Sequence, residues 1–235
     1  MDGAPNEGKR LEISVGGREF DRIPIRTHVI AVGDDLDPVI ESYAVPAVET
    51  GDWLFVTEKI VAISQGRSYP VSSIHPRRLA TFLSRYVTKT SYGIGLGMPE
   101  TMEMALRECG TVRIVFAAGV SAVTKLFGRS GDFYRVAGER ARGIDGPTRG
   151  TLPPYNEHVV LVPDKPDAVA AHIKQLIAAH GKNVDVFVVD INDIGGNILG
   201  STASKSVTET LPLILQDNPL GQGHQSTPLG IIRAR

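Results

Sequence analysis

The sequence predicts a mixed α/β fold with mixed sheets and flanking helices, and three observations indicate it. Val186–Val189 is an unbroken, largely β-branched apolar run of the kind that forms a strand buried on both faces. Residues 168–179 carry apolar side chains at helical spacing between this run and another at 159–162. Trp53–Val56 is a further short apolar run that follows a Gly-Asp turn. We therefore predict a βαβ unit over residues 159–190 within a larger α/β domain.

Length and composition set the limits of this prediction. The chain has 235 residues, of which 42% are hydrophobic and 22% charged, as in ordinary globular proteins. We expect a single domain over residues 1–235, with two lobes of about residues 1–120 and 121–235 as the alternative. Such a chain is long enough to bury a sizeable core.

Charge, hydropathy and cysteine content exclude several classes of protein. The net charge of −1 gives no general attraction to nucleic acid or to an anionic membrane, so we expect neither as a partner. No stretch approaches the roughly 18 apolar residues that span a bilayer, and the N-terminus lacks a secretory h-region. We therefore expect a cytoplasmic protein. The single cysteine, Cys109, ends a helical pattern, which favours a buried structural thiol over a nucleophile.

The N-terminal half contains elements with clear boundaries. We expect residues 1–10 to be frayed and Asp34 or Asp35 to cap a helix. The predicted elements are a Gly-Gly hairpin over 11–23, a strand at 26–32, a helix at 36–43, a strand at 53–56, helices from 75 to about 87 and at 99–109, and a strand at 112–117. After the predicted βαβ unit, a short helix includes 211–215 and a closing strand covers 228–233.

The acidic, glycine-containing stretch that follows Val189 is the first candidate site. Asp190, Asn192 and Asp193 follow the buried strand and precede Gly195 and Gly196. In open α/β sheets ligands bind beyond the carboxyl ends of strands, and such oxygens suit Mg²⁺, Mn²⁺ or Ca²⁺. Glycines also let the backbone approach a phosphate. A plain turn is the alternative interpretation, because Asp, Asn and Gly-Gly are ordinary turn residues.

Two other regions indicate anion binding. Residues 125–155 combine several arginines, including Arg129 and Arg135, with glycines, and guanidinium groups beside free backbone amides suit phosphate or carboxylate. A solvated surface loop is the alternative. Glu58 and Lys59 lie between two apolar runs, where they either pair with each other or line a cleft. The sequence contains no P-loop, no Cys/His zinc pattern and no G-x-S-x-G motif.

Several stretches, taken in order, resemble the coenzyme F420-0:γ-glutamyl ligase family. The most specific is Gly51–Arg67, G-D-W-L-F-V-T-E-K-I-V-A-I-S-Q-G-R, which is similar to that family's G-D-V-L-V-V-T-Q-K-I-V-S-K-A-E-G-R. The others are G-D-D-L at 33–36, L-V-P-D-K-P-D at 161–167, V-D-I-N at 189–192 and the closing segment 223–233. The resemblance touches most of the chain in patches.

The resemblance implies a fold, a reaction and a partner set. It implies a GTP-dependent amide ligase that activates a carboxylate of a phosphorylated acceptor as an acyl phosphate, which glutamate then attacks. It also implies two divalent ions, Mg²⁺ or Mn²⁺, and a homodimer. Asp190 matches a family metal aspartate, and Glu58 and Lys59 match a nucleotide-contacting pair. Residues Gly221–Gln225, with Gly221 and Gln222 as the candidates, fall near the Gly-rich loop that touches nucleotide and metal. Arg67 ends the best-matched stretch and is a further candidate for phosphate.

This sequence also departs from the family pattern. Ile63 stands where the family has a lysine, Ile191 replaces a threonine, and the N-A-G-[IV]-D element with its metal aspartate has no counterpart. Asp145, in G-I-D-G-P-T, is the candidate replacement, and we expect it to lie within bridging distance of the ions that Asp190 holds. The alternative function is a protein that retains the fold and binds a nucleotide or phosphorylated cofactor without ligation. The sequence alone does not name the acceptor or choose GTP over ATP.

Overall fold

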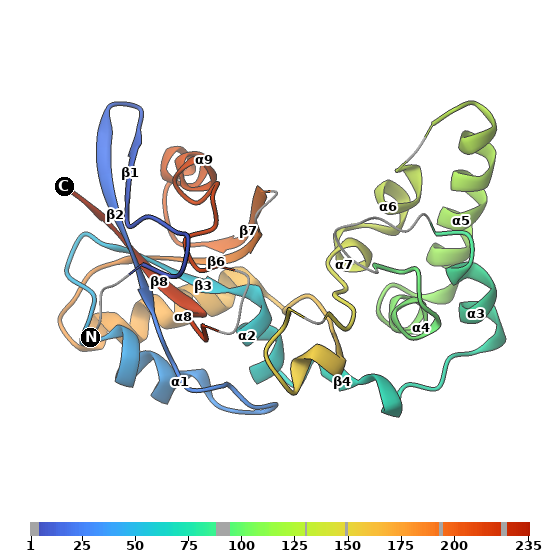
Figure 1. The fold of residues 1–235 in the computed structure, drawn as a ribbon, viewed down its shortest axis with the longest axis horizontal. Helices are drawn as coiled ribbons and strands as arrows, with labels where there is room; N and C mark the ends of the chain where they lie inside the picture. The colour runs from blue at the N-terminus through green and yellow to red at the C-terminus, as the bar shows by residue number, and fades with distance from the viewer. Residues whose placement is uncertain (1–4, 88–94, 130, 149, 193–194, 222–224) are drawn as a thin grey trace. The chain divides into compact units, whose positions relative to one another are not determined.

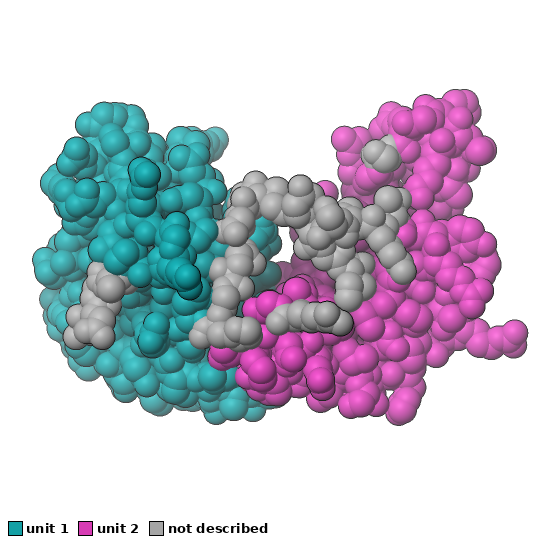
Figure 2. Space-filling model, viewed as in Figure 1, with its two compact units in different colours: residues 1–66, 163–235 teal, residues 67–162 magenta. Residues whose placement is uncertain are grey.

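The chain forms two compact units in the computed structural model, which describes residues 5–87, 95–129, 131–148, 150–192, 195–221 and 225–235. Unit 1 comprises Met1–Gly66 and Pro163–Arg235, and unit 2 is the intervening segment Arg67–Val162 (Figure 2). These units differ from the two lobes considered above, because residue 120 lies inside a helix of unit 2. Unit 1 is therefore built from both ends of the chain.

Unit 1 is organised around a mixed sheet, which confirms the predicted fold class. Within the described residues this sheet has six strands in the order β1-β2-β8-β3-β6-β7. The strands are β1 (Glu12–Val15), β2 (Arg18–Ile25), β3 (Trp53–Thr57), β6 (Asp185–Asn192), β7 (Gly195–Ser201) and β8 (Leu229–Ala234). Strands β3 and β6 are parallel, and every other pairing in this sheet is antiparallel.

Helices cover both faces of this sheet. They are α1 (Leu36–Val39) with the π-helical turn η1 (Ile40–Ala44), α2 (Glu58–Ser64), α8 (Pro166–Ala179) and α9 (Lys205–Ile214). Helix α9 lies on one face, with α8 and α1 on the other (Figure 1). Alternate residues of β6 point to opposite faces, and Phe187 and Val189 pack with Leu211 and Ile214 of α9. The central strand is thus buried on both faces, as its composition predicts.

Two glycines allow close approaches in unit 1. A Cβ atom at Gly230 in β8 would lie 2.3 Å from Cζ of Phe55 in the neighbouring strand. A Cβ atom at Gly200 in β7 would lie 2.3 Å from the carbonyl carbon of Pro166, at the start of α8. Since real Cβ atoms do not approach other atoms so closely, these positions need glycine to let the ring and the helix pack against the sheet.

Unit 2 is largely helical. Its elements are β4 (Ser68–Pro70), η2 (Val71–Ser73), α3 (Arg78–Ser84), α4 (Pro99–Glu108), α5 (Thr111–Leu126), α6 (Asp132–Ala137), α7 (Glu139–Arg142), η3 (Tyr155–Glu157) and β5 (His158–Val160). Its core gathers α4 around Met102 and Leu106 with Ile114 of α5. Among the described helices none is by itself long and apolar enough to cross a membrane, and α4 and α5 pass that test only as a pair bent by 119°.

A buried carboxylate links α4 to the segment before α3. The side chain of Glu103 is 2% exposed. Nε of Arg77 lies 3.0 Å from one of its carboxylate oxygens, and Nε of Arg107 lies 2.9 Å from the other. Burial alone would raise the pKa of Glu103, but the hydrogen bonds from Arg77 and Arg107 together lower it below its usual value. Arg77 therefore has a structural role.

Three predicted elements are wrong. Residues 112–117 belong to α5 rather than to a strand: Ile114 and Ala117, three residues apart, are the buried ones, so helical packing overrides the β-branched composition. Residues 26–32 form no strand. After β2 the backbone leaves the sheet, and the amide of Thr27 donates a hydrogen bond to the carbonyl of Ser226. The βαβ unit does not form, because β5 pairs with β4 in unit 2, whereas β6 pairs with β3 and β7.

Candidate functional site

Three segments of unit 1 meet at one edge of the sheet. Thr57 at the end of β3 lies opposite Val189 in the parallel strand β6, so Glu58 and Asp190 follow at the same edge. Strand β8 runs antiparallel to β3 and begins at this edge, where the amide of Thr57 donates to the carbonyl of Pro228 at 2.9 Å. The polar segment before β8 therefore reaches the carboxyl ends of β3 and β6, where ligands collect in α/β sheets.

Glu58 and Lys59 are the first two residues of α2, directly after β3. Both are half-buried, and both have interactions within the protein. Ile63 is 2% exposed and belongs to the buried face of the same helix. The two charged residues thus lie at the sheet edge, and their contact with a nucleotide stays a prediction.

Asp190 and Asn192 are the last part of β6 and not a loop after it. They pair with Asn197 and Gly195 of β7 in an antiparallel hairpin, and both are half-buried. Gly196 lies so close to the strand that a Cβ atom there would be 3.3 Å from the carbonyl oxygen of Asp190. Asp193 lies outside the described residues. The structure therefore places a carboxylate and an amide at the sheet edge on a paired strand.

The segment between α9 and β8 is the third segment that reaches this edge of the sheet. Gly221 has a φ angle of +74°, and a Cβ atom there would lie 3.4 Å from Nε2 of Gln225. Gln222 lies outside the described residues. Among the buried side-chain atoms that the structure describes, Oε1 of Gln225 is one without a hydrogen-bond partner. A buried acceptor without a donor is costly, so a ligand donor at this position would be stabilising.

The N-terminal segment holds this loop in place. Nδ2 of Asn6 donates to the carbonyl of Leu220 at 2.8 Å and to Oγ1 of Thr227 at 2.9 Å. Asn6 is 7% exposed, so the expected fraying of residues 1–10 is wrong for this residue. Nothing in a polar N-terminus indicates such a contact, because its partners lie more than two hundred residues away in the chain.

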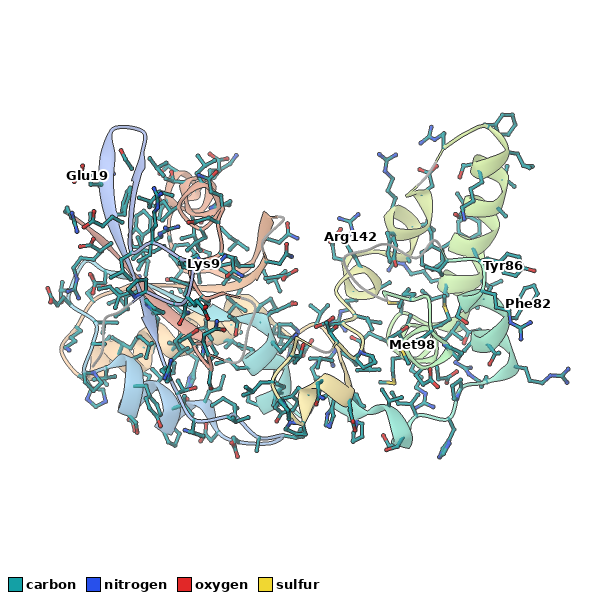
Figure 3. The ribbon with its side chains drawn as sticks, in the orientation of Figure 1. Lys9, Glu19, Phe82, Tyr86, Met98 and Arg142 are labelled. Atoms are coloured by element: carbon teal, nitrogen blue, oxygen red, sulfur yellow. The ribbon has the colours of Figure 1, made fainter. Side chains whose placement is uncertain are left out.

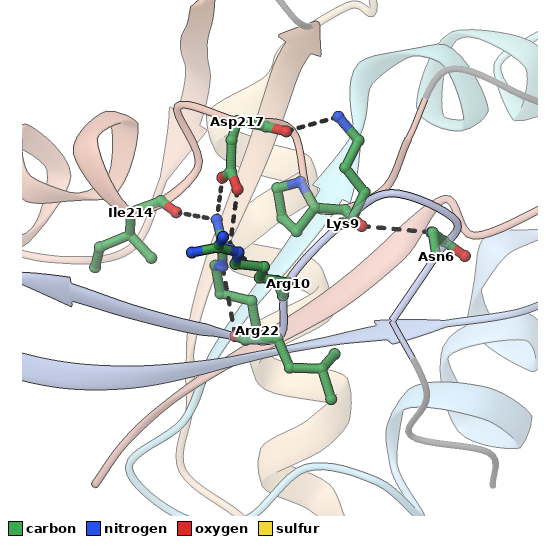
Figure 4. Close-up of polar contacts among 8 residues, drawn as sticks. Asn6, Lys9, Arg10, Arg22, Ile214 and Asp217 are labelled. Atoms are coloured by element: carbon green, nitrogen blue, oxygen red, sulfur yellow. Dashed lines mark hydrogen bonds and ion pairs between the residues drawn. The ribbon is translucent and has the colours of Figure 1, made fainter.

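A buried arginine fixes the start of the same loop (Figure 4). Arg22 of β2 is 1% exposed, pairs with both carboxylate oxygens of Asp217, and donates to the carbonyls of Ile214 at 3.0 Å and Arg10 at 2.7 Å. Lys9 donates to the carbonyl of Asp217 at 2.7 Å. Burial alone would raise the pKa of Asp217, but the hydrogen bonds and charge of Arg22 lower it below its usual value.

The remaining candidate residues belong to unit 2. Arg67 donates through Nε to the carbonyl of Val162 at 2.7 Å and pairs through Nη2 with Glu108 at 2.5 Å. Arg140 shares the same carboxylate at 2.9 Å. The Arg67 guanidinium thus holds the two ends of unit 2 and helix α4 together, and phosphate binding by Arg67 stays a prediction.

Arg129 and Arg135 lie on either side of one carboxylate. Both pair with Asp132 at the start of α6, at 3.1 and 3.3 Å, while their own side chains are 60% and 70% exposed. The hydrogen bond from Arg129 is the main cause that lowers the pKa of Asp132. Two guanidinium groups around one buried carboxylate leave a net positive, exposed group, which is compatible with anion binding.

Asp145 lies on an irregular segment that forms a single antiparallel bridge with Val160, with 2.9 Å hydrogen bonds in both directions. It is half-buried and has interactions within the protein. Asp145 belongs to unit 2 and Asp190 to unit 1, so their predicted approach to shared ions stays a prediction. Within the described ranges, His, Cys, Asp and Glu form no group of three that could hold a metal ion.

Cys109 is a structural residue, as its sequence context predicts. It is half-buried at the end of α4 and packs against the core of unit 2. Burial raises the pKa of its thiol, which disfavours the reactive thiolate.

A comparison with protein families identifies the family of this chain. The family model described as F420-0:Gamma-glutamyl ligase matches residues 24–204, more than three quarters of the chain. The match contains β3, α2 and β6, and ends before the loop that carries Gly221 and Gln225. No curated protein matches the chain. The extent of this match shows that the chain belongs to the F420-0:γ-glutamyl ligase family.

Proposed function

We propose that the protein is an amide ligase of the γ-glutamyl ligase type. It would use GTP and Mg²⁺ or Mn²⁺ to join glutamate to a carboxylate of a phosphorylated acceptor. The observation that carries the proposal is the arrangement at the sheet edge, where Glu58, Asp190 and the segment before β8 lie at the same end of the neighbouring strands β3, β6 and β8. Membership of the family supplies the reaction class.

The proposed chemistry has two steps. A carboxylate oxygen of the acceptor attacks the γ-phosphorus of GTP, which forms an acyl phosphate and releases GDP. The amine of glutamate then attacks the acyl carbon and gives up a proton to water, the amide bond forms, and inorganic phosphate leaves with the electrons of the broken C–O bond. Positive groups that hold the transferring phosphoryl group stabilise the charge that develops in such steps.

The chain's own residues have distinct roles in this proposal. Lys59, at the start of α2, would neutralise charge on the nucleotide phosphates, next to Glu58. Gly195, Gly196 and Gly221 would let the backbone approach the nucleotide, and Gln225 would accept the hydrogen bond that its buried oxygen lacks. Arg129 and Arg135, with Arg67 as a further candidate, would contact the phosphate of the acceptor.

The residues present fit a hard divalent ion. Asp190 and Asn192 offer half-buried oxygen ligands at the sheet edge. Magnesium is usually held by one or two carboxylates together with waters and substrate phosphates, so it does not require a preformed group of three acidic residues. Asp190, Asn192 and Asp193 are the residues of unit 1 that would hold Mg²⁺ or Mn²⁺, which would neutralise phosphate charge when bound. Asp145 is the candidate metal ligand of unit 2.

The test is a glutamate-dependent turnover assay. Purified protein with GTP, Mn²⁺, L-glutamate and F420-0 should release phosphate and form an amide between the carboxyl group of F420-0 and the amine of glutamate, detected by mass spectrometry. Omission of glutamate should abolish the amide product. Replacement of GTP by ATP tests the choice of nucleotide.

The second candidate function is a protein that binds a nucleotide or a phosphorylated cofactor but does not catalyse ligation. The observation that favours it is Ile63, a buried apolar residue where the family has a cation. Metal-dependent GTP binding without product from F420-0 and glutamate would support this candidate and contradict the ligase proposal for this acceptor.

A further inference from the structure

The segment Asn6–Arg10, which we call the strap, contacts the loop that precedes β8. The described residues of this loop form two arms, Asn218–Gly221 and Gln225–Thr227. The strap lies before residues 24–204, the part of the chain that the family model matches. Its effect on the candidate site therefore has to be derived from its own contacts.

Asn6 joins the two arms through one nitrogen atom. Nδ2 of an asparagine carries two hydrogens. In Asn6 it donates to the carbonyl of Leu220 on the first arm at 2.8 Å and to Oγ1 of Thr227 on the second arm at 2.9 Å. Oγ1 of Thr227 in turn donates to the same carbonyl of Leu220 at 3.0 Å. All three residues are buried, so this closed set of hydrogen bonds fixes the distance between the arms.

The strap is itself held at two further points. Nζ of Lys9, labelled in Figure 3 and drawn close up in Figure 4, donates to the carbonyl of Asp217 at 2.7 Å. Nη2 of the buried Arg22 donates to the carbonyl of Arg10 at 2.7 Å. Between these points and the arms, the amide of Lys9 donates to the carbonyl of Asn6 at 2.9 Å and closes a turn. The strap therefore presents Asn6 to the loop from a fixed position.

Both arms contain a backbone conformation that needs such support. Asn218 on the first arm has a φ angle of +49°, and Ser226 on the second has a φ angle of +52°. Residues other than glycine seldom adopt these values, which persist where the surrounding structure holds them and are concentrated at ligand sites. Nδ2 of Asn218 donates to the carbonyl of Gly221 at 3.0 Å, and Oγ of Ser226 donates to the carbonyl of Thr27 at 3.0 Å. The arms are thus held in one specific conformation.

The position of the Gln225 acceptor depends on how far apart the arms are. A Cβ atom at Gly221 on the first arm would lie 3.4 Å from Nε2 and 3.5 Å from Cδ and Oε1 of Gln225 on the second. The amide group of Gln225 therefore packs against Gly221. Its Oε1 atom is the buried acceptor without a donor. If the arms moved apart, this oxygen would leave the position at which it can accept a hydrogen bond from a ligand.

From these contacts we propose that Asn6 is a positioning residue for the nucleotide site, because it keeps the two arms at the separation at which Gly221 and Gln225 bind GTP. The inference rests on the proposed function, which supplies GTP as the ligand of this loop. The apparent affinity for a ligand falls with the fraction of protein in the binding-competent conformation. Loss of the Asn6 hydrogen bonds lowers that fraction and therefore lowers the affinity for GTP.

The first experiment is calorimetric titration of GTP with Mn²⁺ into the wild type and two variants. Asn6→Ala removes the amide, and Asn6→Asp keeps the shape of the side chain but has no hydrogen to donate when ionised. Each should raise the Kd for GTP by at least about tenfold, as expected if about one molecule in ten keeps the competent loop. An unchanged Kd in both variants, beside a wild type that binds GTP, would overturn the proposal and leave the proposed function standing.

Thr202→Val is the matched control for lost stability. Oγ1 of Thr202 accepts from the amide of Val186 at 2.9 Å and donates to the carboxylate of Asp185 at 3.3 Å, at the opposite end of β6 from Asp190. The variant therefore also removes two hydrogen bonds from unit 1, but away from the loop. It should bind GTP as the wild type does, even with a lowered melting temperature. An equal loss of GTP affinity in Thr202→Val would overturn the proposal.

Thr227 provides a second route to the same interaction. Thr227→Val removes the hydroxyl that accepts from Asn6, whereas Thr227→Ser keeps it, so the serine variant should bind GTP more tightly than the valine variant. Combining Thr227→Val with Asn6→Ala should weaken binding by less than the product of the two single effects, because both remove the same contact. Equal binding by the two Thr227 variants, or fully independent effects, would contradict the role of this hydrogen bond.

Hydrogen exchange of the ligand-free protein tests the strap independently of the nucleotide. The amide of Gly221 donates to the carbonyl of Asn218, and the amide of Thr27 donates to the carbonyl of Ser226, so each reports on one arm. Both should exchange faster in Asn6→Ala than in the wild type. Unchanged exchange at both amides would overturn the proposal whatever the result with GTP. A wild type that binds no GTP would instead contradict the proposed function, and the exchange result alone would then decide whether Asn6 holds the loop.

Discussion

Thr57 and Val189 lie opposite each other at the carboxyl ends of the parallel strands β3 and β6. This one register relationship brings Glu58 and Asp190, more than 130 residues apart in the chain, to the same edge of the sheet. The segment before β8 reaches that edge through the bond from Thr57 to Pro228. The candidate site of unit 1 therefore follows from strand order and not from a local motif.

Arg129 and Arg135 should contribute to binding of the acceptor's phosphate. We expect the double variant Arg129→Ala and Arg135→Ala to raise the KM for F420-0 by at least about tenfold, since each charge-assisted hydrogen bond contributes roughly 1.5–3 kcal/mol. The affinity for GTP should be unchanged. Arg142→Ala is the matched control, because Arg142 lies on neighbouring α7 and is also half-exposed, at 51%. An unchanged KM in the double variant would exclude these arginines from the acceptor site.

Gly230 should be required for the packing of the central sheet. In Gly230→Ala the new methyl group would overlap the ring of Phe55, and we expect a loss of about 1–3 kcal/mol in the free energy of unfolding, as for overpacked cores. Urea denaturation measures this loss. Combining Gly230→Ala with Phe55→Leu should cost less than the sum of the two single changes, because the smaller side chain makes room. Additive losses would show that the contact is not the cause.

The Arg22–Asp217 pair should make stability depend on pH. Because the pKa of Asp217 is lowered in the folded state, its contribution is present above the usual aspartate value of about 3.9 and is lost as pH falls through the folded pKa. At pH 7 we expect Asp217→Asn to destabilise by about 1 kcal/mol, less than the roughly 1.5–3 kcal/mol of a charged hydrogen bond, because the carboxylate is 44% exposed and solvent screens the pair.

The control for this pair is Arg22→Met, which removes the same interaction from the other side. In that background Asp217→Asn should have little further effect at pH 7. The difference between wild type and Asp217→Asn, measured by urea denaturation, should shrink between pH 7 and pH 3. A difference that is constant over this range would contradict the role of the ionised pair.

Much of the fold could be predicted from local patterns. The buried run at 186–189, the amphipathic helix at 168–179, the Gly-Gly hairpin and the Asp35 cap, whose side chain accepts from the amide of Asp37, depend on neighbouring residues and are confirmed. The strand at 112–117 was wrong because β-branched composition does not reveal that the run continues a helix of 16 residues. The βαβ unit was wrong because element order does not determine which strands pair.

The candidate site likewise combines features that the sequence indicates with features that only the folded chain reveals. The sequence indicated Glu58, Lys59 and Asp190 individually, but their common edge depends on the β3–β6 register. Asn6 gave no signal as a contributor, because its role arises from contacts that only the folded chain makes. Gln225 lies in the stretch that the resemblance indicated, but only the structure reveals its buried oxygen without a donor. The division into units was also hidden, since no linker-like composition marks residues 66 and 163.

The most direct test of the site is calorimetric titration of GTP in the presence and absence of Mn²⁺. Wild type should bind GTP more tightly with the metal, and Asp190→Asn should lose at least about tenfold in that affinity, or about 1.4 kcal/mol. Asp185→Asn, at the opposite end of β6, should bind as wild type does. Equal binding by wild type and Asp190→Asn, or no binding by wild type under either condition, would contradict a metal–nucleotide site at this edge of the sheet.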